Sequence, residues 1–525
     1  MIAKIARRLG FQQSVPVAVV DDWVMPSMTR LPIELAPREG AAKCLVDQFG
    51  RLQIGDSSWT LELTLAAGAR WVPAIATERI NQKVPTPGVI ETTIQTPSGP
   101  VVQRVAAGVV DGEPAAIVEV ENTGGVAIAV GLVARPLQMQ GRGHLGSVAV
   151  DTASLVVEGS PAIRFGAAPA SVAAHEGADG DLLQAMPDAN DATLAAHAKC
   201  RSGGAQAAAV WPLPHTATLR FVVELAGTVR SEAAVPTAAD IGRGWQSHLK
   251  QGLRVDVDEI DVDGHLQMAT QSVLTLWPED EDVPTAVLAL AEAGFGRDAG
   301  RLFERLERCE DDERILRALA RWTQLGEQTH QLEDLELILG RLAKAAHVVA
   351  NNRNGVLSGE GWLDDALVAL GGRLHQIDQP EVAERVQGLR VEVRSITGAA
   401  DALALLTKGR DKRGVWSDGQ MAAASRYVRT VRSVVVKDAG PELAVLPDMP
   451  KQWRGRPIDI FGLPIANGNF SFGLRWHGPR PALLWEAALA PEAPFRITAP
   501  GIDASFSSTE REGEVLLADP GWQTP

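Results

Sequence analysis

The fold is decided by residues 275–306, which read TLWPEDEDVPTAVLALAEAGFGRDAGRLFERL. Two segments in this stretch, PTAVLALAEAG and RDAGRLFERL, have apolar residues at helical spacing and are separated by a glycine turn. Similar segments continue from about residue 238 to about residue 438. Short links force neighbouring helices to run antiparallel, so we expect about eight to ten helices packed as hairpins.

The chain before this helical region is predicted to be β. SWTLELTLA, from Ser58, alternates as a half-buried strand does. GVIETTIQT and VVQRVAAGVV are separated by PSGP, and AAIVEVE and VAIAVGLVA flank residues 122–125, so each pair is predicted to be a hairpin. Residues 167–190 are rich in Ala, Gly and Asp and are predicted to be a loop. Many short strands joined by Gly/Pro turns indicate an antiparallel β-sandwich.

After Pro441 the chain returns to β, because RPIDIFGLPI, NFSFGLRWHG, PALLWEAAL and FRITAP are short and separated by turn residues. We therefore expect a multidomain protein with both α and β structure. Its expected parts are an N-terminal antiparallel β-sandwich (1–235), a central α/α toroid, complete or incomplete (236–440), and a small C-terminal β domain (441–525).

The amino-acid composition excludes several classes of binding partner. The chain has 525 residues and a net charge of −15, which argues against nucleic-acid binding. No apolar run approaches the ~18 residues of a membrane span, so we expect no membrane span and a cytoplasmic protein. The cysteines, Cys44, Cys200 and Cys309, lack metal-ligand spacing, so neither a metal site nor a disulfide framework is expected.

No cofactor is predicted either. The partial glycine motif GRGHLGS at Gly141 leads into a predicted strand, whereas a dinucleotide-binding loop leads into a helix. Walker, His-Glu-x-x-His and Gly-x-Ser-x-Gly motifs are not found in a suitable setting. The sequence leaves the oligomeric state open.

The predicted order of sandwich, linker helix, helical ring and terminal β-sheet resembles that of bacterial six-hairpin glycosidases. This group includes glucoamylase-like hydrolases, disaccharide phosphorylases and rhamnosidases. Residues 275–306 resemble one of their inner and outer helix pairs, and residues 446–478, LPDMPKQWRGRPIDIFGLPIANGNFSFGLRWHG, resemble their terminal β domain. The resemblance implies a carbohydrate ligand and glycoside hydrolysis. Since fewer than the twelve helices of a complete toroid are expected, a non-catalytic carbohydrate-binding or assembly protein is the alternative.

Glycoside cleavage needs two carboxyl groups, ~5.5 Å apart for retention of configuration and ~6.5–9.5 Å apart for inversion. The loop–helix junction NNRNGVLSGEGWLDDALVAL (351–370) supplies Asp364 or Asp365 as acid/base, with Glu360 as a weaker alternative. Trp362 is the candidate for stacking on a sugar face. The alternative interpretation is that the two acids complement the helix dipole and that Trp362 packs into the core.

A second junction places Trp277 before four consecutive acids, residues 279–282. Repulsion among adjacent carboxylates favours a protonated member, so Glu281 is the candidate for the opposing carboxyl group and Trp277 for a second stacking platform. The alternative is a solvated acidic cap before Pro284. Trp322, near a polar turn, is a third candidate for substrate binding, and its alternative is again the core.

Overall fold

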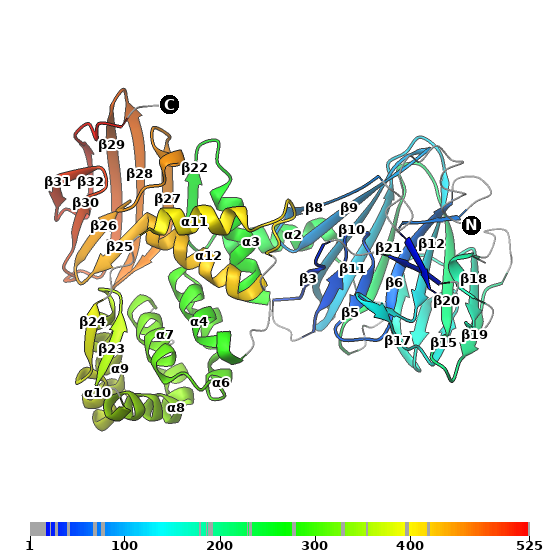
Figure 1. Ribbon diagram of the computed structural model, residues 1–525, viewed down its shortest axis with the longest axis horizontal. Coiled ribbons are helices and arrows are strands. Elements are labelled where there is room, and N and C mark those ends of the chain that lie inside the picture. Colours follow the sequence, from blue (N-terminus) through cyan, green and yellow to red (C-terminus); the bar gives the residue numbers. More distant parts are fainter. Residues whose placement is uncertain are drawn as a thin grey trace. The chain divides into compact units, whose positions relative to one another are not determined.

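The computed structural model describes most of the chain (Figure 1). The described residues are 17–20, 23–26, 30–38, 42–66, 71–74, 79–177, 180–184, 186, 193–227, 229, 234–275, 280–326, 331–352, 355–393, 398–416 and 420–522. The chain forms two compact units, Met1–Gln246 and Ser247–Pro525. No helix within the described ranges is long and apolar enough to cross a membrane.

The first unit is built on two large antiparallel sheets (Figure 1). The nine-stranded sheet runs β19 (Ala196–Lys199), β15 (Ser147–Val150), β16 (Ser154–Val157), β17 (Ser160–Phe165), β21 (Thr218–Glu224), β11 (Glu113–Asn122), β10 (Gly99–Val110), β9 (Val89–Thr96), β8 (Ile80–Thr86). The other runs β18 (Ser171–His175), β20 (Gln206–Leu213), β12 (Ile128–Arg135), β6 (Thr60–Ala66), β5 (Leu52–Ile54), β4 (Cys44–Val46), β3 (Ile33–Leu35), with β7 (Trp71–Pro73) beside β6. Two small strand pairs, β1 (Val17–Val20) with β2 (Trp23–Pro26) and β13 (Leu137–Gln138) with β14 (Gly141–Arg142), complete the unit.

The two sheets pack face to face, and aromatic rings from both sheets contact one another between them. Trp211 of β20 meets Phe165 of β17 and Phe221 of β21 edge-on, with centroids 5.0 and 4.9 Å apart. The predicted antiparallel β-sandwich is therefore confirmed.

Of the two predicted hairpins, one is confirmed and the other is wrong. β9 and β10 pair directly across residues 97–98. By contrast, β11 and β12 belong to different sheets, so residues 122–125 pass from one sheet to the other. The Asn122 amide donates to the carbonyl of Val126 at 2.9 Å and to that of Leu213 at 3.0 Å. This side chain holds the crossing in place, and turn composition alone does not distinguish such a crossing from a hairpin.

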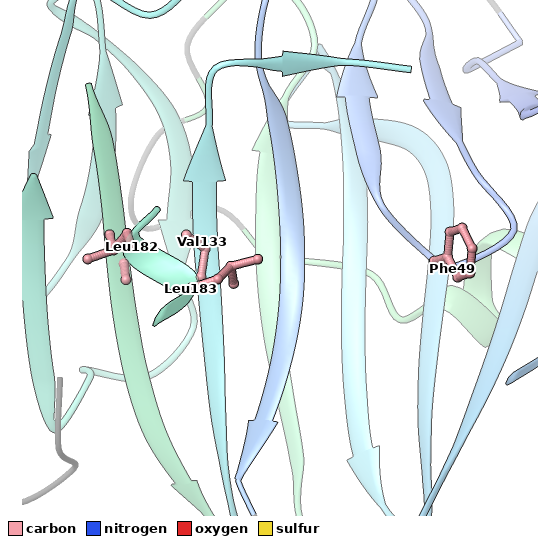
Figure 2. Packing of buried hydrophobic residues seen from close by; sticks show 5 residues of the cluster. Phe49, Val133, Leu182 and Leu183 are labelled. Carbon is pink, nitrogen blue, oxygen red and sulfur yellow. The ribbon is translucent and has the colours of Figure 1, made fainter. Parts of the chain in front are cut away.

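The predicted half-exposure of β6 is also wrong, because all seven of its residues are buried. The polar face carries Glu62, which is in register with Val133 of β12. Leu182 and Leu183 of the short helix η2 (Leu182–Gln184) belong to the same apolar cluster as Val133 (Figure 2). The stretch predicted to be a loop thus contains β18 and η2, and it helps to exclude water from this face.

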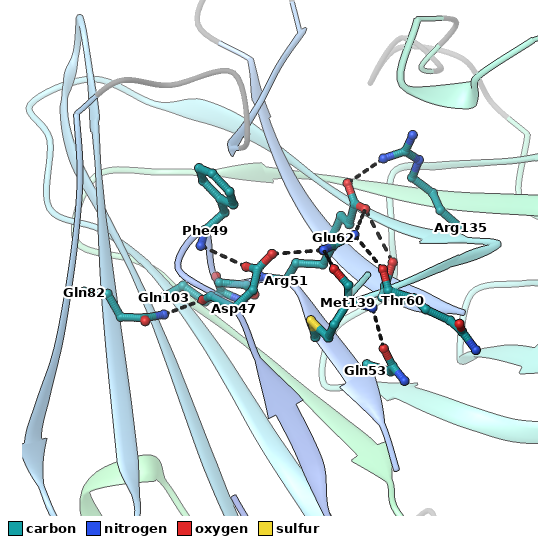
Figure 3. Close-up of polar contacts among 12 residues, drawn as sticks. Asp47, Phe49, Arg51, Gln53, Thr60, Glu62, Gln82, Gln103, Arg135 and Met139 are labelled. Carbon is teal, nitrogen blue, oxygen red and sulfur yellow. Dashed lines mark hydrogen bonds and ion pairs between the residues drawn. The ribbon is translucent and has the colours of Figure 1, made fainter. Parts of the chain in front are cut away.

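A chain of buried charges runs along the covered face (Figure 3). Arg51 lies 3.0 Å from Asp47 and 4.0 Å from Glu62, and Arg135 lies 2.8 Å from Glu62 and 2.6 Å from Asp181. All five side chains are at most 3% exposed. We call these five residues the sandwich ion chain.

The second unit begins at Ser247, in the last turn of the helix α2 (Ala238–Leu249), and its middle part is helical. Its helices are α3 (Val262–Thr275), α4 (Val283–Glu292), α5 (Gly296–Gly300), α6 (Phe303–Leu306), α7 (Asp312–Leu325), α8 (Gln331–Asn352), α9 (Leu363–Gln376), α10 (Pro380–Gln387), α11 (Ala399–Lys408) and α12 (Gln420–Val435), with the 3₁₀ turn η3 (Asp280–Asp282) before α4. α4 packs on α3, α7 and α12, and α9 packs on α7 and α10. The predicted helical region is confirmed, and its closure into a ring stays a prediction.

Several short strands interrupt the predicted helical region. Residues 390–393 form β24 (Arg390–Val393), which pairs in parallel with β23 (Val356–Gly359). Gly388 caps the C-terminus of α10, and the following RVEV alternates as a strand does.

The C-terminal strands form two sheets, as the predicted return to β requires. One sheet runs β22 (Arg254–Val257), β27 (Ile458–Ile465), β28 (Gly468–His477), β29 (Arg480–Leu489), β32 (Glu512–Leu516). The other runs β25 (Val436–Ala439), β26 (Glu442–Val445), β30 (Arg496–Ala499), β31 (Asp503–Ser508), and the turn η4 (Lys451–Trp453) lies between β26 and β27. Because β22 precedes the helices and pairs with β27, helices and C-terminal strands share one unit. The predicted domain boundaries at residues 235 and 440 stay predictions.

Candidate functional site

A cavity of about 220 Å³ lies in the second unit, where the end of α7 and the start of α9 meet the β25–β26 turn and the strands β27 and β29. Its polar lining comes from Gln324, Asp365, Asp438, Glu442 and Asn467. Its apolar lining includes Leu443, Ile465, Leu489 and Phe495. An apolar wall with a few converging polar groups is typical of small-molecule sites.

Asp365 reaches this cavity because of where α9 begins. The helix starts at Leu363, so Asp364 and Asp365 lie in its first turn, and both are exposed. A Cβ atom at Gly440 would lie 3.4 Å from Oδ2 of Asp365, so the β25–β26 turn passes directly beside this carboxylate. Gly440 has φ +58°, a conformation that favours glycine.

Asp438 forms the buried side of the cavity and is held by two arginines. Its Oδ2 lies 2.9 Å from Arg321 Nη2 and 3.0 Å from Arg432 Nη2. Burial alone would raise the pKa of Asp438, but the charges of Arg321 and Arg432 lower it to about 2. Asp438 is therefore ionised at neutral pH and cannot act there as a proton donor.

Behind Asp438, five side chains form a closed series of contacts that we call the helical ion circuit. Arg321 lies 3.5 Å from Glu292, which lies 3.2 Å from Arg429, which lies 3.0 Å from Glu360. The indole N–H of Trp362 donates to Glu360 at 3.0 Å, and the Arg321 guanidinium covers the Trp362 ring at 4.6 Å. The circuit connects α4, α7 and α12 to Glu360 and Trp362, which directly precede α9, and so positions the first turn of α9, where Asp365 lies.

Two of the predicted stacking tryptophans are buried. Trp362 is 3% exposed and belongs to the circuit. Trp322 is 2% exposed, donates from its indole nitrogen to the Gly296 carbonyl at 2.7 Å, and meets Phe303 edge-on. Neither ring lines the cavity. The third candidate, Trp277, lies outside the described residues.

The structure does not bring the predicted carboxylate pair together. Glu281 is exposed and lies just before α4, whereas Glu292, the last residue of α4, belongs to the circuit. Ten helical residues rise about 15 Å. Glu281 therefore lies about one length of α4 away from the end of that helix which faces Asp364 and Asp365. Of the three predicted catalytic residues, only Asp365 lines the cavity.

Sequence reasoning missed Asp438, Glu442 and Asn467. The available signal was the turn DAGPE (438–442), in which two acids flank Gly440 and Pro441. No local pattern connects that turn with residue 365, because the two are neighbours only through packing. Among the side chains that the structure describes, no cluster of three or more His, Cys, Asp or Glu residues is arranged to hold a metal ion.

Comparisons with known proteins give similarity of structure only. No family model matches the chain, and no curated protein is significantly similar in sequence. Among solved structures, a bacterial glucoamylase complexed with acarbose is 9% identical, with a TM-score of 0.42 over 71% of this chain and 68% of the other. A proposed kojibiose phosphorylase from the human microbiome is 6% identical, with a TM-score of 0.45 over 93% of this chain and 92% of the other.

Proposed function

We propose that this protein is carbohydrate-active and that the cavity beside Asp365 is its sugar-binding site. The observation that carries the proposal is the mixed lining of the cavity, in which apolar residues, including Phe495 and Leu443, occur together with carboxylates and amides. A sugar ring offers surfaces of both kinds, because its C–H face is apolar and its edge carries hydroxyl groups. Carboxylates and amides accept or donate hydrogen bonds to such hydroxyls.

Glycoside hydrolysis is the second candidate, with Asp365 and Glu442 as the two carboxyl groups. Both side chains line the same cavity, and within the described part of the chain neither forms a hydrogen bond or ion pair. Asp438 is unsuited to the acid role because Arg321 and Arg432 keep it ionised. In this proposal Asp365 remains the acid/base candidate, and Glu442 replaces Glu281 as the opposing carboxylate.

Calorimetric titration of the full chain with a panel of mono- and disaccharides tests binding. We expect at least one sugar to bind, and Asp365→Asn to weaken it. Asp364→Asn is the matched control, because Asp364 is the next residue on the same helix turn and does not line the cavity. If no sugar binds, or if the two variants weaken binding equally, the proposed site is wrong.

An aryl-glycoside assay separates hydrolysis from binding. If hydrolysis is the activity, Asp365→Asn and Glu442→Gln each abolish product release, whereas Asp364→Asn leaves it unchanged. Sugar binding without product release from any glycoside of the panel would contradict the hydrolytic candidate and leave the binding protein.

A further inference from the structure

We infer that the cavity selects a sugar that carries a free amino group, such as a hexosamine, over neutral and anionic sugars. This inference rests on the proposed sugar-binding function and specifies its ligand class. It follows from the carboxylates that line the cavity: the protein neutralises one of them with arginines and leaves the other two without an ion-pair partner among the described residues.

One of the three lining carboxylates is already neutralised by the protein. Arg321 and Arg432 both contact Asp438 from the buried side, and neither arginine lines the cavity. The positive charges therefore lie behind a carboxylate and are not presented to a ligand.

The other two carboxylates have no such partner. Asp365, from the first turn of α9, and Glu442, from the start of β26, reach the cavity from different elements. No lysine or arginine is among the described residues that line it, and no described side chain pairs with either carboxylate. Two exposed negative charges that lack an ion-pair partner in the described structure therefore border one partly open cavity, next to its apolar lining residues.

An ammonium group is the partner that this arrangement lacks. A charge-assisted hydrogen bond between an ammonium and a carboxylate is roughly twice as strong as a neutral one. A carboxylate or phosphate on the ligand would instead be repelled. At about 220 Å³, the cavity is smaller than the usual ~300–1,000 Å³ of drug-sized sites, so we expect one sugar ring and not an oligosaccharide.

The test is calorimetric titration of the full chain with glucosamine, glucose, N-acetylglucosamine and glucuronic acid at low salt. N-acetylglucosamine keeps the position of the nitrogen and removes its charge. We expect glucosamine to bind about tenfold tighter than glucose or N-acetylglucosamine, and glucuronic acid to bind most weakly. Salt should reduce the glucosamine preference, because it screens charges at a partly open site.

Isosteric variants assign the preference to its residues. In the double variant Asp365→Asn/Glu442→Gln, glucosamine and glucose should bind equally, whereas Asp364→Asn should keep the full preference. A folded double variant should still bind both sugars through hydrogen bonds to neutral hydroxyls and lose only its selectivity. A variant that does not fold should bind neither sugar.

The outcomes separate this inference from the proposed function. If glucose binds as tightly as glucosamine, or if the preference survives the double variant, the amino-sugar inference is overturned and sugar binding stands. If ethanolamine displaces glucosamine at equal concentration, the cavity recognises an amine alone and the sugar function is overturned. If neither glucosamine nor any sugar of the panel binds, both are overturned.

Discussion

The two units contain buried ion clusters of similar composition but opposite accessibility. In the sandwich ion chain, every charged side chain is at most 3% exposed. The cluster around Asp438 is as tightly paired, yet Glu360 and Arg429 are 20% and 26% exposed and Asp438 borders a cavity. Similar ion pairs are therefore fully buried in one unit and border a cavity in the other.

The number of cations per carboxylate is a second difference. Asp47 has Arg51 as its cation, and burial raises its pKa although Arg51 opposes the shift. Asp438 has two arginines, and their combined charge overcomes the effect of burial. Two arginines thus lower the pKa of the buried Asp438 carboxyl, whereas the pKa of Asp47, which has a single arginine, is raised.

The largest effect is expected from breaking the sandwich ion chain. Arg135→Met leaves Glu62 and Asp181 as buried carboxylates without their shared cation, which should lower the free energy of unfolding by about 3–5 kcal/mol. Urea denaturation measures the loss, and hydrogen exchange should locate it in β6 and β12. Arg243→Met is the control, because Arg243 is 68% exposed and should change stability by less than about 1 kcal/mol. Equal effects of the two variants would contradict the structural role of the chain.

A slightly smaller effect is expected from Asp438→Asn. The substitution leaves Arg321 and Arg432 without their shared anion, at a cost of about 3 kcal/mol, the lower end of the range for buried pairs, because water can reach the site through the cavity. Hydrogen exchange should increase in α7 and α12 and stay unchanged in the sandwich. Increased exchange confined to the first unit would be incompatible with the contacts described here.

Acid titration tests the two-arginine explanation. The pKa of Asp438 is lowered from 3.8 to about 2 on folding, so its contribution to stability is present above pH 3.8 and is lost as pH falls towards 2. The loss is on the order of 2 kcal/mol. For Asp47, whose pKa is raised, the contribution is present at low pH and lost as pH rises.

Carboxyl NMR of the full chain measures both titrations. Asp438 should titrate near pH 2 and Asp47 above its usual range. If Asp438 titrates at an ordinary pH, or if Asp438→Asn leaves the acid sensitivity of the second unit unchanged, the explanation fails.

The smallest effect is expected at Trp362. Trp362→Phe keeps a ring beneath Arg321 and removes the N–H that Glu360 accepts, which should lower stability by about 1–2 kcal/mol. Thermal unfolding measures the loss. Trp362→Phe should also weaken ligand binding, because the circuit positions Asp365. Trp322→Phe removes an indole hydrogen bond to the Gly296 carbonyl but lies outside the circuit, so it should weaken ligand binding less. Equal losses of binding would argue against positioning of Asp365 by the circuit.

Local patterns in the sequence were sufficient for most elements. Helical spacing predicted α3, α4, α7 and α9, and the PSGP turn predicted the β9–β10 hairpin. The junction at residues 360–365 identified Asp365 as a candidate, because a polar loop before a helix is visible without any tertiary contact. These features depend on residues within one or two turns of each other.

The features that only the tertiary structure decided depend on contacts between residues far apart in the chain. The polar face of β6 is buried because Leu182 and Leu183 lie on the same side of the sheet, and residues 122–125 cross between sheets because Asn122 reaches Leu213. Asp365 shares its cavity with Glu442 and not with Glu281, since the β25–β26 turn folds against the start of α9. Periodicity determines which face of an element is apolar or polar, whereas the partner of that face is set by packing between distant segments.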